Sequence, residues 1–161
     1  MRKIKYKLYY PSHNKVFNIM GIVFNKEGLI DTVYIPIKDV LPEYYGNTDC
    51  VLALYPKDKI ELLEFTGHYD IDGNEIYEGY IVRFAIPNPT GYENYDGEWV
   101  DTTEEEPCGE VILKEGCYCV KYPNGELLPF NTPTSETNKV PIIELFEVIG
   151  NIYENKELLD E

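Results

Sequence analysis

Alternating apolar and polar residues run through much of the chain, and this period of two predicts β-strands rather than helices. In residues 3–10, Ile4, Tyr6, Leu8 and Tyr10 fall on one face of the expected strand, and lysines dominate the other. Similar runs follow at residues 16–24, 29–37 and 51–55. The first three runs predict a β meander within an N-terminal domain of residues 1–60. A short helical turn is expected near residues 57–63.

The rest of the chain, residues 61–161, alternates short strand-like runs with tight turns. Strands are expected at residues 80–84, 109–113, 117–122, 127–130 and 146–153, and one helical turn at 155–159. Gly116 and the pair Asn124-Gly125 mark two hairpins, because Gly and Asn tolerate the positive φ of a tight turn. This rhythm predicts a small SH3-like barrel from about residue 65 to 153, since closure removes exposed edges. The expected fold is therefore all-β, with the N-terminal meander packed on the barrel.

A long segment interrupts these strands at residues 87–107. It is acidic, rich in Pro, Gly and Asn, and poor in aliphatic residues, so we expect an irregular loop that is mobile or ordered by a partner. Its aromatic residues Tyr92, Tyr95 and Trp99 are the candidate anchors for a protein partner. The alternative is that they fold back and cover an edge strand.

Charge and composition narrow the class of protein. The 161 residues carry a net charge of −15, with 29 acidic and 14 basic residues, which opposes binding to nucleic acid or an anionic membrane. Such charge is typical of a soluble protein, or of a surface that imitates nucleic acid. No apolar run reaches the length of a membrane span, and the N-terminus lacks the apolar region of a signal peptide. We therefore expect a cytoplasmic protein whose four cysteines stay reduced.

The most distinctive stretch is residues 62–82, LLEFTGHYDIDGNEIYEGYIV, in which Asp72-Gly73 predicts a hairpin turn. A second phrase, FEVIGNIYEN, occupies residues 146–155. Together they resemble the signature of the YopX-like proteins of bacteriophages and prophages. Tyr80 and Lys156 depart from the family pattern, which has Asp and Pro there. The positions that we assign a structural role, at turns or close approaches of the backbone, are Gly67, Asp72, Gly73, Gly79 and Gly150.

The resemblance implies a β-rich accessory protein of phage or prophage origin, and the family carries no established activity. The sequence motifs also give no positive support for a metal site or a catalytic site. Asp70, Asp72 and Asn74 alternate as in a calcium loop, but Glu75 and Ile81 stand where an EF-hand needs Gly and Glu. The four cysteines lack the spacing of a zinc site, and neither His13 nor His68 accompanies a nucleophile motif. We predict no catalytic residue, cofactor or metal.

Three functions remain as hypotheses. The first is a non-enzymatic protein that binds an unknown host or phage protein. The second is an acidic mimic of nucleic acid that inhibits a host DNA- or RNA-handling protein. The third is a nucleic-acid-binding barrel, for which Arg2, Lys3, Lys5 and Lys7 form the single basic cluster. A homo-oligomer is compatible with each of these three functions. A fourth hypothesis, a hydrolase that uses Cys or Asp/Glu, has the least support.

Overall fold

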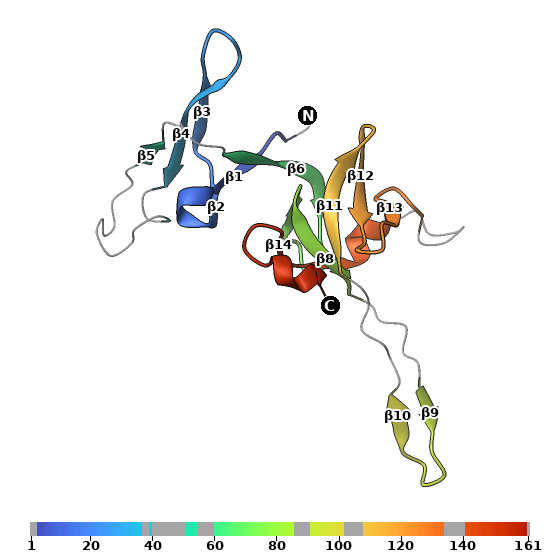
Figure 1. Cartoon of the computed structure of the whole chain (residues 1–161). Helices are drawn as coiled ribbons and strands as arrows, with labels where there is room; N and C mark the ends of the chain where they lie inside the picture. The colour runs from blue at the N-terminus through green and yellow to red at the C-terminus, as the bar shows by residue number, and fades with distance from the viewer. Residues whose placement is uncertain are drawn as a thin grey trace. The chain divides into compact units, whose positions relative to one another are not determined.

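The fold is all-β, as the alternation predicts. A computed structural model describes residues 3–36, 39, 51–54, 60–85, 91–101, 108–133 and 141–160. Its strands pair antiparallel, and the three helical segments with defined bounds are single 3-10 turns (Figure 1). The chain divides into two compact units, Met1–Phe65 and Thr66–Glu161. Each unit is described by itself, and the packing of one half on the other stays a prediction.

The first unit contains two groups of strands. β1 (Tyr6–Tyr10) pairs with β2 (Lys15–Asn18) on one side and with the first residues of β6 (Glu61–Tyr69) on the other. The 3-10 turn η1 (Pro11–His13) joins β1 to β2. β3 (Gly21–Phe24), β4 (Ile30–Pro36) and β5 (Val51–Leu54) form a separate sheet in that order. Leu8, Phe17, Val33 and Ile35 from β1, β2 and β4 form the shared core.

The expected meander is wrong in one respect. Residues 16–24 do not form one strand: the run breaks at Ile19 and Met20, so that β2 pairs with β1 and β3 pairs with β4. Apolar residues stand on both sides of the break, and Ile19 at the break packs against the core, so the local sequence carries no signal of it. The helical turn near residues 57–63 is also wrong where the structure describes it, since β6 begins at Glu61. Ile4 lies outside β1 and is exposed.

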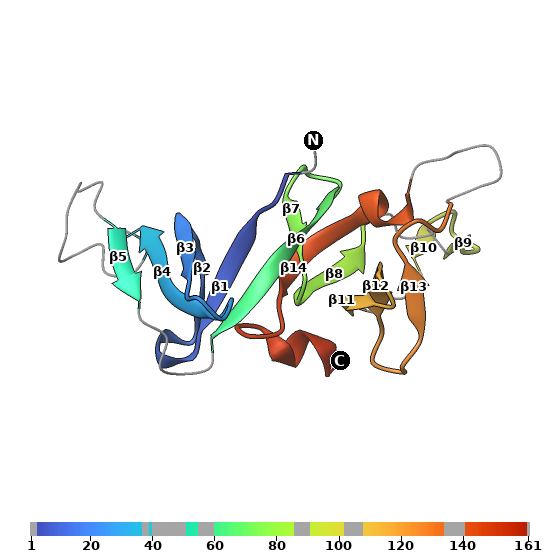
Figure 2. The same ribbon diagram turned by 90° about the horizontal axis from the view of Figure 1, so that it is seen from above.

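The second unit is built on a five-stranded antiparallel sheet in the order β13-β12-β11-β8-β14 (Figure 2). Its strands are β8 (Tyr80–Phe84), β11 (Gly109–Lys114), β12 (Cys117–Lys121), β13 (Leu127–Pro129) and β14 (Phe146–Asn151). The end of β6 turns back into β7 (Glu75–Tyr77). The 3-10 turns η2 (Ile142–Leu145) and η3 (Lys156–Leu159) flank β14, and η3 matches the helical turn expected there. Closure into an SH3-like barrel stays a prediction.

The segment expected as an irregular loop contains a regular hairpin. β9 (Gly91–Glu93) pairs with β10 (Trp99–Asp101), so the expectation of irregular backbone is wrong for residues 91–101. The turn explains this outcome. Asn94 accepts hydrogen bonds through Oδ1 from the N–H groups of Asp96 and Glu98, at 3.0 and 2.9 Å, and Gly97 supplies the positive φ. Hydrogen bonds between residues close in sequence therefore close the turn of this hairpin.

The same five-residue turn closes four hairpins, at residues 25–29, 70–74, 94–98 and 122–126. In each, the first residue donates its N–H to the carbonyl of the fifth, and the glycine at the fourth position donates to the carbonyl of the first. That glycine always has a positive φ, the geometry of a turn that ends in a left-handed residue. At the first three sites, the side chain of Asn25, Asp70 or Asn94 also accepts from the backbone.

Two glycines of the family phrases permit close contacts near the end of β14. Gly79 has a φ of +77°, and a Cβ atom there would lie 3.1 Å from Cε2 of Tyr153. Its N–H donates to Val111 at 2.8 Å, and its carbonyl accepts from Ile152 at 2.9 Å. A Cβ at Gly150 would lie 2.7 Å from Oδ1 of Asn155. Gly79 and Gly150 thus let β8, β11 and the turn after β14 approach one another.

We expect Gly79→Ala to lower the free energy of unfolding by more than Gly125→Ala. Both residues have positive φ, which costs a side chain about 1–2 kcal/mol, but a Cβ at Gly125 meets no atom within 4 Å. The difference between the two variants isolates the crowding against Tyr153. Urea denaturation of both variants measures it, and equal losses would show that Gly79 serves only the turn.

Candidate functional site

The side chain of Asp70 holds the turn at residues 70–74 against β14. It is 6% exposed. Its Oδ1 accepts the N–H groups of Asp72 at 3.0 Å and Asn74 at 2.7 Å. Its Oδ2 accepts Nδ2 of Asn74 at 2.9 Å and the N–H of Val148 at 3.1 Å. The pair Asp70 and Asn74, which resembles part of a calcium loop in sequence, is therefore engaged with N–H donors.

These hydrogen bonds set the charge state of Asp70. Burial alone raises the pKa of a carboxyl group, but the donors from Asn74, Val148 and Asp72 together outweigh it, and the pKa of Asp70 falls below its ordinary value of 3.8. Asp70 is therefore a carboxylate at neutral pH, with both oxygens occupied as acceptors. Its hydrogen bonds therefore connect the turn at residues 70–74 to β14, and the ionised side chain has no proton to donate in acid catalysis.

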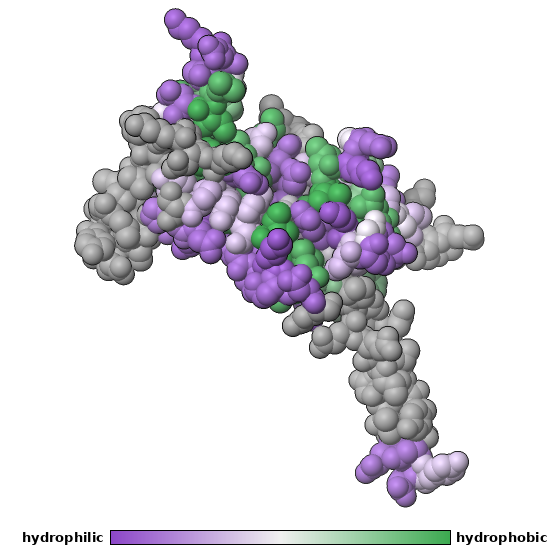
Figure 3. Space-filling model, in the orientation of Figure 1, coloured by the Kyte–Doolittle hydropathy of each residue, from purple (hydrophilic) through white to green (hydrophobic). Residues whose placement is uncertain are grey.

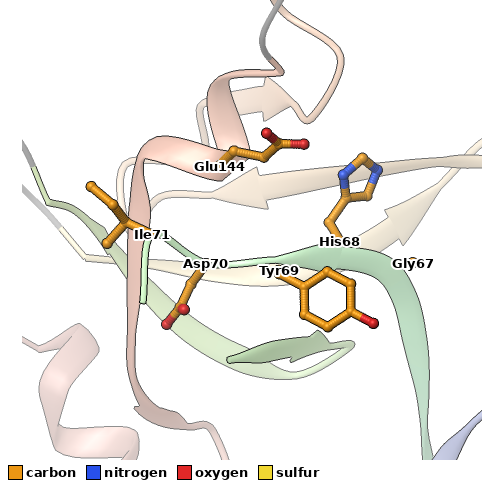
Figure 4. A pocket seen from close by; sticks show the side chains of 6 residues that line it. All are labelled: Gly67, His68, Tyr69, Asp70, Ile71 and Glu144. Carbon is orange, nitrogen blue, oxygen red and sulfur yellow. The ribbon is translucent and has the colours of Figure 1, made fainter. Parts of the chain in front are cut away.

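An open cleft of about 360 Å³ lies beside this turn, lined by Gly67, His68, Tyr69, Asp70, Ile71 and Glu144. Figure 4 shows the side chains of His68 and Glu144 on one side of the chain and those of Tyr69 and Asp70 on the other. The His68 ring meets Phe130 edge-on, with ring centroids 5.5 Å apart. Sequence reasoning considered His68 alone and missed Glu144, because η2 brings it here from 76 positions away.

The side chains that line the cleft supply an imidazole, a phenol, two carboxylates and one apolar group. His68 and Glu144 share no hydrogen bond, and among the residues that the structure describes the lining includes no Ser, Thr, Cys or Lys. A nucleophile activated by a neighbouring base needs both groups within hydrogen-bond reach. An imidazole and a carboxylate on an open surface, beside the half-exposed Ile71, can instead contact a polar group of a bound protein.

Two side chains of the second unit that could act as nucleophiles, Cys119 and Tyr77, have raised pKa values, which favours their protonated forms. Cys119 is buried in β12, and burial followed by the nearby Cys117 raises the pKa of its thiol. Burial also raises the pKa of Tyr77, whose hydroxyl donates to Oε2 of Glu75 at 2.7 Å. Cys108, Cys117 and Cys119 are free cysteines, and Cys50 lies outside the described residues. Among those residues, no group of three or more His, Cys, Asp and Glu side chains could hold a metal ion.

Of the three candidate anchors, the structure describes the side chain of Tyr95 alone. Tyr95 is in the turn between β9 and β10 and is fully exposed. Tyr92 pairs with Val100, and Trp99 pairs with Glu93, so the two aromatic residues occupy neighbouring positions of the backbone register. Their role as anchors, and the mobility of the segment, stay predictions.

The two units differ sharply in charge, which whole-chain composition conceals. Residues 1–65 contain 9 basic and 8 acidic residues, whereas residues 66–161 contain 5 basic and 21 acidic residues. The basic cluster near the N-terminus belongs to the first unit, where Nζ of Lys5 lies 5.8 Å from the centre of the Phe65 ring. The second unit therefore carries the whole of the net negative charge. Neither part of the chain that the structure describes contains a helix suited to crossing a membrane.

The comparisons with known proteins agree with the resemblance seen in sequence. The family model described as "YopX protein" matches residues 5–160. The crystal structure of protein EF1440 from Enterococcus faecalis is similar, with a TM-score of 0.56 and 16% identity over 99% of each chain. At this identity the likeness concerns the fold. No curated protein matches the chain.

We expect Asp70→Asn to lower the free energy of unfolding at neutral pH by about 2 kcal/mol, because an amide NH₂ replaces an acceptor oxygen that faces N–H donors. Because the pKa of Asp70 is lowered by folding, its stabilisation is present above its unfolded value of 3.8 and is lost as pH falls through the folded value. The difference between wild type and variant should therefore shrink in acid.

Urea denaturation between neutral and acidic pH measures this difference. Asp72→Asn removes the same charge from the exposed side of the same turn and serves as the control. An Asp70→Asn variant as stable as Asp72→Asn at neutral pH would contradict the role of the Asp70 carboxylate in holding the turn against β14.

Proposed function

We propose that this chain, which belongs to the YopX protein family, acts by binding a partner protein through its acidic second unit. We further propose that it is a cytoplasmic accessory protein of phage or prophage origin and has no enzymatic activity of its own. The partner is a host or phage protein with a basic surface. Two observations support the proposed lack of enzymatic activity. Both oxygens of the buried Asp70 carboxylate accept hydrogen bonds that hold the fold together. The described residues that line the cleft include no Ser, Thr, Cys or Lys nucleophile beside a base.

The observation that carries the proposal is the separation of charge. Several carboxylates of the second unit are exposed and make no hydrogen bond or ion pair with another described residue: Asp96, Glu98, Glu115, Glu144, Glu157 and Asp160. An excess of one charge on one unit attracts a partner of the opposite charge and speeds their encounter. Since these groups are not needed to hold the fold, their charge is available for recognition.

The exposed Tyr95 adds a second kind of contact. Aromatic side chains dominate the energetics of many protein interfaces, and a fully exposed tyrosine in a turn has apolar surface for a partner to cover. Tyr92 and Trp99 on the flanking strands are the further candidates. In this proposal charge draws the partner in, and the hairpin of residues 91–101 supplies the specific contact.

The second candidate function is an acidic mimic of nucleic acid, favoured by the same excess of carboxylates. It differs in the identity of the partner, which would then be a protein that normally binds DNA or RNA through a basic groove. Direct binding of nucleic acid has less support. The first unit, which holds Arg2, Lys3, Lys5 and Lys7, has nearly balanced charge.

Affinity capture from host lysate with the tagged chain, followed by mass spectrometry, tests the proposal. We expect a basic protein that is retained at low salt and released at high salt, because screening weakens attraction between surface charges. Replacing Tyr92, Tyr95 and Trp99 together with Ser should abolish retention and leave the melting temperature unchanged. Release of the partner by duplex DNA or RNA would favour the mimic.

A variant with Ser at the partly exposed Tyr6 and Tyr9 of the first unit controls for the loss of aromatic residues elsewhere, and it leaves Tyr10, which packs against the core, in place. A lower melting temperature with the partner retained in the hairpin variant would instead show that the three aromatic residues cover an edge strand. Retention that ignores salt would contradict the electrostatic proposal.

A further inference from the structure

The hairpin of β3 and β4 exposes large apolar side chains that the core does not use. Met20 is 63% exposed, Val23 43%, Phe24 56% and Leu29 61%. Figure 3 shows apolar surface on this hairpin below its hydrophilic tip. Single exposed apolar residues are ordinary, but a group of them on one element is typical of an interaction surface.

The same hairpin ends in an edge strand. β3 lies at one end of the sheet β3-β4-β5, and no strand among the described residues pairs with its outer side. Its sequence, GIVF, contains no charged residue and no proline, which are common means of protecting an edge. The sheet has a bulge here, but the extra residue is Asp31 of β4, because Val23 pairs with Thr32 and Phe24 with Ile30. β3 itself has no inserted residue.

The charge distribution indicates what kind of strand could cover this edge. The first unit has nearly balanced charge, and the hairpin tip carries one Lys and one Glu, so no local charge repels an identical hairpin. Two acidic second units would repel each other, so copies of the chain can approach most easily through their first units. A basic partner would be attracted to the second unit instead. The occupant that fits β3 is thus a neutral apolar strand, which a second copy supplies.

We propose that two copies of this chain associate through β3, with the two β3 strands paired antiparallel about a twofold axis. Antiparallel pairing of identical strands is self-complementary, since a contact of Ile22 in one copy with Val23 in the other is repeated by the twofold axis as Val23 with Ile22. Backbone hydrogen bonds then form along both edges, and Val23 and Phe24 of each copy lose their exposure to water. The association lies on another surface than the acidic unit and does not depend on the proposed function.

Sedimentation velocity of the full chain over a wide range of concentrations tests this dimer. We expect wild type to pass from monomer to dimer as concentration rises. Added NaCl should strengthen the dimer, because it screens repulsion between the acidic units. Binding of a basic protein partner should respond to salt in the opposite direction, so the two proposals can fail separately.

Val23→Lys should abolish the dimer by placing a charge on the edge. Leu113→Lys adds the same group at a comparably exposed apolar residue of the second unit and should dimerise as wild type does. Val23→Thr keeps a β-branched side chain and serves as a milder variant, for which we expect a several-fold weaker dimer and an unchanged melting temperature.

Hydrogen exchange supplies a readout specific to strand pairing. Amides of residues 21–24 should exchange more slowly at high protein concentration, whereas an interface made by side chains alone would leave them unchanged. A wild type that stays monomeric at all concentrations would overturn the proposal. So would a dimer that survives Val23→Lys, or exchange at residues 21–24 that is independent of concentration.

Discussion

The hydrogen bonds of Asp70 join the two sequence phrases that identify the family. One oxygen of its carboxylate closes the turn at residues 70–74, and the other accepts the N–H of Val148 in β14. A second contact runs alongside, from the N–H of Ile71 to the carbonyl of Phe146. Because β14 pairs with β8, and β8 with β11, this single buried side chain connects the β6–β7 hairpin to the central sheet of its unit.

Comparison with equivalent sites shows why a carboxylate is needed there. Asn25 and Asn94 close the same turn, but an amide offers one acceptor oxygen, and it is used within the turn. Asp70 has a second oxygen for β14. We expect its contribution to exceed that of the cross-strand ion pair between Arg83 and Glu147, whose side chains are 39% and 30% exposed. An exposed pair contributes up to about 1 kcal/mol, whereas buried hydrogen bonds to a charged group contribute about 1.5–3 kcal/mol.

Local sequence signals predicted the turns and most strands of this fold but not how distant strands are joined. Asp72-Gly73 and Asn124-Gly125 are readable because a glycine with positive φ leaves a short-range signature. The break at Ile19 and Met20 left none, since both residues are apolar and the apolar run of residues 16–24 continues across it. Gly109 was also missed. A Cβ there would lie 2.3 Å from Cγ1 of Val120, a constraint that appears only when β11 and β12 are paired. The partner of Asp70 is 78 residues away, beyond any local pattern.

Among the candidate sites too, features of a short stretch of sequence could be predicted, and features that depend on the fold could not. Tyr95 could be selected from sequence because an aromatic residue within an acidic polar segment is a local feature. The cleft needs η2 beside β6, and the separation of charge needs the boundary between the units, so neither could be read from composition. That boundary changes the physical argument. Averaged over the chain, a net charge of −15 suggests solubility or imitation of nucleic acid. Confined to one unit, the same charge leaves the other unit able to contact neutral surfaces. An edge strand without charged residues, in the unit whose charge is nearly balanced, is where a second copy meets the least electrostatic repulsion.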